Sequence, residues 1–426
     1  MTKHVTWGLL GSEKLSTLRR TRTLGLSSTI RSFNDLAVPG IGGVWYGKQI
    51  LLATLGVVVA EELRAKGMQI QNIEMTNAIE ALACCLAFKN NHWKSDARLL
   101  GINTLQGKDD LSFQQVRHPK FYVNQPMRML TIQTLPALGF VESDGTRFNT
   151  FCCSNTGKRF VEIATAAFHP YRRSVIDHLT LWAQSKDNRV ETKSLYQALS
   201  PLTPLSKEAT SLLGERLIQG ANEDPEYKNR RRNGLAWVDR LRKSKQQQKS
   251  TWEEQPQEIS NAHWHDLRSG TLFFHVRDAA IAVLDELEIY IDNQQNAQDF
   301  SLREKIPDQL KSVIAHLRLA ASDYLKMEHT DDGAKVFCSA CKNKDFHRIL
   351  RFLVERDQRI LRLVGDKVKP GPAFRGDVTQ TMPNNPNKFS LPDDISYRMR
   401  NLYRLNLDMH GQLEDSLNAD RGEEKI

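Results

Sequence analysis

Apolar residues recur at helical spacing along most of the chain, so the sequence predicts a mainly α-helical protein. In the segments 70–90, 276–291 and 306–326, residues three and four positions apart are apolar. Segment 36–65 is the most apolar, and its unbroken run from Ile50 to Ala60 is shorter than the roughly 20 residues that span a bilayer. We therefore expect a buried helix there and no membrane segment.

The stretch 111–170 adds a predicted β-hairpin. Asp144-Gly145 lies between the runs Phe140-Val141-Glu142 and Arg147-Phe148-Asn149-Thr150-Phe151, in which apolar residues alternate. Asp-Gly is typical of two-residue type I′ turns, in which both central residues need a positive φ. We therefore expect two antiparallel strands, at 140–142 and 147–151, joined by a tight turn.

A helix is predicted on each side of this hairpin. Before it, a polar capping residue followed by Pro126 favours a helix start. Pro136 lacks the backbone N–H that a helix interior needs, so it is expected to kink that helix or end it near Thr134. The second helix is expected over 155–168, because a proline close behind Phe168 disfavours its continuation.

The order helix, strand, turn, strand, helix over 111–170 resembles the winged helix-turn-helix superfamily. This resemblance implies duplex DNA as a partner, with the helix after Pro126 in or over a major groove. Winged helices serve equally as protein–protein modules, so other protein subunits remain an alternative partner. The basic side chains of this stretch are the candidate phosphate contacts: Arg117, Lys120, Arg128, Arg147, Lys158 and Arg159.

Residues 221–262 are rich in lysine, arginine and glutamine and are expected to form a basic linker. Their densest basic run, Arg230-Arg231-Arg232, is a further candidate DNA contact, and Trp237 gives the segment an apolar helical edge. Two interpretations stay open here. One is a basic helix that sits on nucleic acid, and the other is a solvated connector between domains.

Gly42, Gly47 and Lys48 have the spacing of a phosphate-binding loop, whose amides and lysine hold nucleotide phosphates. A glutamine follows where such a loop has Ser or Thr for Mg²⁺, and Val44-Trp45-Tyr46 is bulky where the backbone must curl. A nucleotide hydrolase using residues 42–49 is therefore kept only as an alternative. No other catalytic motif stands out, and we expect a protein that is not an enzyme.

Residues 263–365 are predicted to form a C-terminal helical domain that contains a possible metal site. Cys338 and Cys341 follow a short predicted strand, Val336-Phe337, and form half of a tetrahedral zinc site that His347 or His329 would help to complete. Two free thiols are the preferred interpretation, so no cofactor is expected, with zinc as the alternative. The following basic segment, 349–363, is expected to be helical.

The chain of 426 residues carries 59 Lys and Arg against 50 Asp and Glu, a net charge of +9. This excess suits a polyanionic partner, although ordinary surface lysine and arginine account for it equally well. The few cysteines favour a reducing, cytoplasmic setting. We expect five regions: 1–110, helical with a basic arm; 111–220, winged-helix-like with following helices; 221–262, the linker; 263–365, helical; and 366–426, a Pro/Asn-rich loop, a last helix and a tail.

These features predict a mainly helical, multi-domain protein with a small β-hairpin wing in a winged-helix domain. The expected function is non-catalytic DNA binding, as a subunit of a larger bacterial-type nucleoprotein machine. The first alternative is a helical scaffold or adaptor that uses the winged helix to contact protein partners. The second is the nucleotide hydrolase described above.

Overall fold

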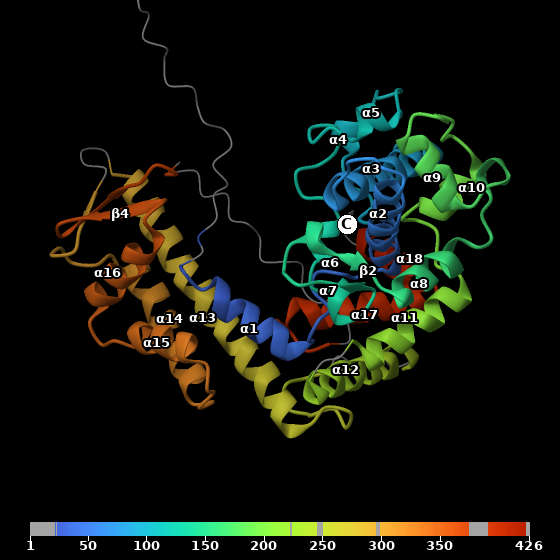
Figure 1. Ribbon diagram of the computed structural model, residues 1–426. Helices are drawn as coiled ribbons and strands as arrows, with labels where there is room; N and C mark the ends of the chain where they lie inside the picture. Colours follow the sequence, from blue (N-terminus) through green and yellow to red (C-terminus); the bar gives the residue numbers. More distant parts are fainter. Residues whose placement is uncertain are drawn as a thin grey trace, which may run out of the picture. The chain divides into compact units, whose positions relative to one another are not determined.

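The structure is a computed structural model that describes residues 22, 24–221, 224–244, 250–294, 299–374 and 391–422. It confirms a mainly helical protein, with 60% helix and 4% strand (Figure 1). The basic arm expected near the N-terminus lies mostly outside the described residues. Within the described part of the chain, no helix has both the length and the apolar character needed to cross a membrane.

The chain divides into two compact units, and the division differs from the five expected regions. Unit 1 comprises Met1–Arg31 and Thr271–Pro383, and unit 2 comprises Ser32–Gly270 and Asn384–Ile426. The boundaries therefore fall inside two helices, α1 (Ser27–Ala37) and α13 (Asn261–Asp292).

The core of unit 2 is built on the helix pair α2 (Gly47–Ala65) and α3 (Asn72–Asn90), which lie side by side (Figure 1). Both helices are apolar on nearly every side, which is typical of a helix buried all round. The buried helix expected in segment 36–65 is thus α2. The other helices of unit 2 are α4 (Ile102–Leu105), α5 (Phe113–Val116), α6 (Arg128–Thr131), α7 (Thr134–Ala137), α8 (Asn155–Thr165), α9 (Val175–Ala183), α10 (Lys193–Leu199), α11 (Lys207–Gln219), α12 (Pro225–Lys243), α17 (Tyr397–Met409) and α18 (Leu413–Gly422).

The expected tight hairpin at Asp144-Gly145 is wrong. The strands are β1 (Val141–Glu142) and β2 (Cys152–Cys153), which pair antiparallel, and the connection between them contains the 3₁₀ helix η1 (Phe148–Thr150). The amide of Asn72 on α3 donates to the carbonyls of Phe148 and Phe151, at 3.2 and 2.8 Å, and both rings are buried. Packing against α3 therefore overrides the local turn preference, and a winged-helix domain at 111–170 is not confirmed.

The helices that flank this connection agree better with expectation. The helix after Pro126 is interrupted, because α6 ends at Thr131 and α7 begins at Thr134. Pro136 cannot donate a backbone hydrogen bond to the preceding turn, which accounts for the break. Helix α8 is confirmed, and the Ser154 hydroxyl caps its first turn by accepting from the backbone N–H of Gly157 at 3.0 Å.

The expected linker is instead largely the helix α12, which packs against α11 and α17. Asp224 caps its first turn, and Pro225 occupies the first helical position. Trp237 is fully buried and meets Trp264 edge to face, with ring centroids 6.1 Å apart. The apolar edge of this segment thus determines its place, and residues 245–249 lie outside the described residues.

Unit 1 contains the helices α14 (Asp308–Leu325), α15 (Asp332–Cys341) and α16 (Phe346–Asp357) and a three-stranded antiparallel sheet. Its strands are β3 (Phe300–Ser301), β4 (Leu361–Val364) and β5 (Lys367–Pro370), in the order β3-β5-β4. Two expectations are wrong here. The strand expected at 336–337 belongs to α15, and the helix expected over 349–363 ends at Asp357, where Gln358 adopts a left-handed conformation with φ +55°.

Candidate nucleic-acid interface

Three of the predicted phosphate contacts lie around the first turns of α3. Arg117 forms an ion pair with Glu74, and the Arg128 Nε donates to the Asn77 side-chain oxygen at 2.6 Å. Arg128 is half-buried, and this burial lowers its pKa. Arg147 is exposed on the β1–β2 connection. The structure therefore brings these arginines to one helix, but a protein group already engages two of them.

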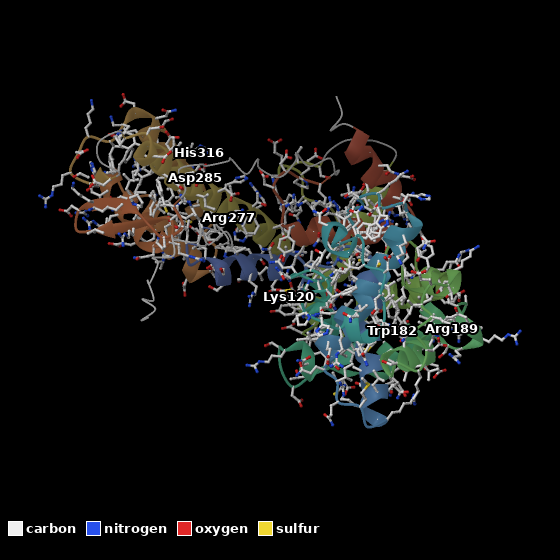
Figure 2. The ribbon with its side chains drawn as sticks, turned by 90° about the horizontal axis from the view of Figure 1, so that it is seen from above. Lys120, Trp182, Arg189, Arg277, Asp285 and His316 are labelled. Atoms are coloured by element: carbon white, nitrogen blue, oxygen red, sulfur yellow. The ribbon has the colours of Figure 1, made fainter. Side chains whose placement is uncertain are left out.

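The remaining candidates of this stretch lie on different elements. Lys120 is exposed in the loop between α5 and α6 (Figure 2). Lys158 lies 3.9 Å from Glu61, whereas Arg159 lines an open groove of about 720 Å³ between α8 and α11. Lysine, glutamate and apolar side chains line the same groove, so its surface is mixed in charge. The candidates of this stretch therefore lie on separate elements, and Lys158 and Arg159 have acidic side chains nearby.

Two of the three arginines at the start of α12 are inside unit 2, which corrects their assignment as DNA contacts. Arg231 is fully buried, and its guanidinium donates to the backbone carbonyls of Leu217 and Pro39, at 2.6 and 3.1 Å. Arg230 is 8% exposed and pairs with Asp266 at 2.7 Å. Both guanidinium groups have acceptors within the fold, as a buried charge requires. Only Arg232 is exposed.

The geometry at residues 42–49 opposes the phosphate-loop interpretation. The backbone N–H of Gly47, at the start of α2, donates to the Asp408 carboxylate at 2.8 Å, so an acid of this chain occupies the place of an anion. Lys48 is buried, and its ammonium donates to the Ala198 carbonyl at 2.6 Å. Burial lowers the pKa of Lys48 to about 7. This lysine is therefore turned into the core and away from any nucleotide.

The candidate zinc ligands are not assembled into a site. Cys338 and Cys341 are buried on α15, and burial raises the pKa of both thiols, to about 12 for Cys341. His347 lies on α16, where its Nε2 is 2.9 Å from the carbonyl oxygen of Glu304. Across the described ranges, no group of three or more His, Cys, Asp or Glu residues is arranged to hold a metal ion.

The hairpin formed by β4 and β5 carries a basic surface that the sequence interpretation missed. In its register Arg362 lies directly opposite Lys369, and Val364 lies opposite Lys367. Residues directly opposite in an antiparallel pair share one face. Arg362 and Lys367 are exposed and Lys369 is half-buried, whereas Leu361 and Val368 on the other face are buried. Among the described residues, no ion pair is found for Arg362 or Lys369, and Lys367 pairs with Asp299 at 3.1 Å.

The turn of this hairpin is tied to α16. Gly365, with φ +64°, and Asp366 form the two-residue turn between β4 and β5. The Asp366 carboxylate accepts from Arg351 on α16 at 2.5 Å and from Arg303 at 2.5 and 2.8 Å, and these arginines lower the pKa of Asp366. The exposed Arg348 lies on the same helix, in its first turn, with its Nε 3.5 Å from the Asp345 carboxylate. The hairpin and the helix therefore form one connected surface.

The hairpin leaves a recognisable trace in the sequence. Gly365-Asp366 stands between runs in which apolar and basic residues alternate, and Gly-Asp between such runs is typical of a two-residue hairpin. Helical spacing upstream hides this trace, because leucine and arginine continue from α16 into β4 without a proline.

Comparisons with protein-family models, with curated proteins and with solved structures gave no match for this chain.

Proposed function

We propose that this is a non-catalytic DNA-binding protein that contacts duplex DNA through the β4–β5 hairpin and the exposed side of α16. The observation that carries the proposal is the opposed pair Arg362 and Lys369. Like charges directly opposite each other in a sheet destabilise it, by roughly 0.2–1 kcal/mol. A row of phosphates beside this face would offset that repulsion, which explains why two cations lie opposite each other.

The neighbouring elements support duplex DNA over other polyanions. Helices α15 and α16 are joined by the short turn 342–345, and the hairpin follows α16 directly. In a helix-turn-helix the second helix enters the major groove with its N-terminal residues against the bases, and a two-stranded ribbon also fits that groove. Arg348 then faces the bases, while Arg362 and Lys369 meet phosphates. We assign to residues 332–370 the winged-helix role that the sequence suggested for 111–170.

The proposal is tested by titrating a labelled duplex of about 20 base pairs with the full chain at several salt concentrations. The logarithm of the wild-type affinity should fall linearly with the logarithm of salt, with a slope of about −0.9 for each phosphate neutralised. In the double variant Arg362→Ala with Lys369→Ala, the magnitude of this slope should be smaller by about two. Absence of wild-type binding at low salt would end the proposal.

A matched control keeps the change in net charge constant. Lys311 is half-buried on α14 and Lys326 is exposed at its C-terminal cap, and each pairs with an aspartate of this helix. The double variant Lys311→Ala with Lys326→Ala removes two cations and should leave the salt slope as in the wild type. An equal loss of slope in both double variants would show that net charge alone governs binding, against the assigned surface.

A further inference from the structure

A second surface, in unit 2, is built around a strained turn. Tyr171 and Arg172 both adopt the left-handed conformation, with φ +50° and +63°, inside the 3₁₀ helix η2 (Pro170–Arg172). Such a backbone costs a residue with a side chain roughly 1–3 kcal/mol, and it persists where the surroundings enforce it, often at binding sites. Because two consecutive residues carry this backbone strain, the surrounding contacts must stabilise the turn.

The strained turn places Tyr171 in a stack of three side chains. On one side its ring stacks with the buried imidazole of His178, with centroids 5.7 Å apart and planes at 28°. The Arg189 guanidinium lies over the tyrosine ring, with its central carbon 4.0 Å from the centroid. The His178 Nε2 also lies 2.9 Å from the Arg189 carbonyl oxygen. Backbone and side chain of Arg189 are thus both held against this column.

The edge of the Arg189 guanidinium is held as firmly as its face. Its Nε and Nη2 donate to the two carboxylate oxygens of Asp187, at 2.9 and 2.7 Å, and Asp187 also accepts from Arg173 at 2.7 Å. These arginines lower the pKa of Asp187, which therefore stays ionised. The Arg189 side chain is nevertheless 59% exposed. It presents a flat, immobilised cation at the edge of unit 2 (Figure 2).

The exposed side chains near Arg189 in the chain and on η2 and α10 are mostly basic, and the exposed Glu191 among them pairs with Lys89. Arg172, Lys186 and Lys193 are exposed, and no ion pair is found for any of them in the part of the chain that the structure describes. Lys193 opens α10, which packs against η2. Asp187 is already shared by two arginines, so the surface keeps a positive excess.

We propose that Arg189 is a stacking platform for an unpaired base of a single-stranded nucleic acid, whose flanking phosphates meet Arg172, Lys186 and Lys193. Proteins stack unpaired bases on arginine planes as well as on aromatic rings. Asp187 takes the Nε edge of the guanidinium, with two of its five N–H groups, so the orientation of the exposed plane is fixed. The face remains for a flat ligand. The choice of a nucleic acid as the ligand of this site rests on the proposed function.

The test compares two labelled strands of about twelve nucleotides, one of oligothymidylate and one with abasic sites, which carry the same phosphates. Arg189→Lys keeps the charge and removes the plane. It should lower affinity for oligothymidylate by about 5- to 100-fold, the loss expected for one base stacked on a side chain, and leave affinity for the abasic strand unchanged. As a control, Lys193→Ala should lower the affinity for both strands by the same factor, because it removes only a phosphate contact.

Unchanged binding of both strands by Arg189→Lys, or an equal loss on both, would overturn the platform. Tyr171→Phe, which keeps the ring, should bind like the wild type, and Tyr171→Leu should repeat the base-selective loss, with folding checked by thermal unfolding. Arg189-dependent binding of an acidic peptide in place of the strands would also refute it. Duplex binding by Arg189→Lys should match the wild type, so the two proposals fail separately.

Discussion

The variant Lys369→Glu separates the stability of the hairpin from its proposed function. In the wild type, the Cβ atoms of directly opposed residues such as Arg362 and Lys369 are about 4.5–5.5 Å apart. Reversing one charge replaces repulsion with attraction across that distance. Each effect is worth roughly 0.2–1 kcal/mol, and solvent screens the pair because Arg362 is exposed. We therefore expect the free energy of unfolding to rise by about 0.5–1 kcal/mol at low salt.

The same substitution should damage DNA binding. It removes one cation from the face and adds an anion beside Arg362, so the salt slope should shrink by about one and affinity at low salt should fall on the order of tenfold. A variant that is more stable but binds DNA less well indicates that the wild-type residue serves binding and not stability.

Two assays on the full chain decide this prediction. Urea unfolding at low and high salt measures the gain in stability, which should shrink as salt rises because the pair is screened. Titration with duplex DNA measures the loss of affinity, with Lys326→Glu at the C-terminal cap of α14 as the control of equal charge change. Either a loss of stability in Lys369→Glu or wild-type affinity for DNA would refute the reasoning.

Three further substitutions test the packing and the buried charges, all by urea unfolding. Burial raises the pKa of Glu80 to about 8, against a smaller lowering by the nearby backbone, so the stability this group contributes is complete below about pH 4.5 and is lost as the pH rises to about 8. Glu80→Gln should remove that pH dependence, and a curve parallel to the wild type would contradict the assignment. Gly56→Ala places a methyl group 2.7 Å from the Thr76 Cα and should lower the free energy of unfolding by about 1–3 kcal/mol. The control Gly214→Ala meets only the flexible end of a methionine at 3.2 Å and should be nearly neutral. Equal losses of stability in the two variants would show that the close helix approach is absent. Three acidic side chains of unit 1 share the Arg22 guanidinium, whose side chain is 4% exposed. Arg22→Ala leaves them without it and should lower the free energy of unfolding by about 3 kcal/mol. A change below about 1 kcal/mol would exclude a structural role for this network.

The helices could be predicted where burial alone decides them. Segment 50–60 is apolar on every side, and α2 is accordingly buried all round. Helix α8 begins where Ser154 offers a capping hydroxyl. In both cases the information lies within a few turns of sequence, so the pattern suffices.

The hairpins could not be assigned from turn residues alone. Asp144-Gly145 has the preferred composition, yet two distant carbonyl contacts from Asn72 hold the following residues in η1 instead of a strand. Gly365-Asp366 does form a tight turn, because alternating side chains on both sides find a buried face and an exposed face. Tertiary packing decides between equivalent local preferences.

The role of a basic residue was the least predictable feature. Arg230, Arg231 and Arg232 are neighbours in sequence, but the first two turn inward, where Arg231 reaches carbonyls on distant segments. Arg362 and Lys369 stand apart in sequence and become neighbours only through the strand register. Charge counts therefore locate basic segments, and only the fold shows which of them face solvent.

Chemical acetylation of lysines, read by mass spectrometry with and without duplex DNA, tests the assigned interface most directly. Bound DNA should protect Lys367 and Lys369 on the hairpin and leave Lys120 and Lys158 of unit 2 as reactive as in the free protein. Protection of Lys120 and Lys158, with the hairpin lysines unchanged, would contradict the central claim and return the interface to the stretch 111–170.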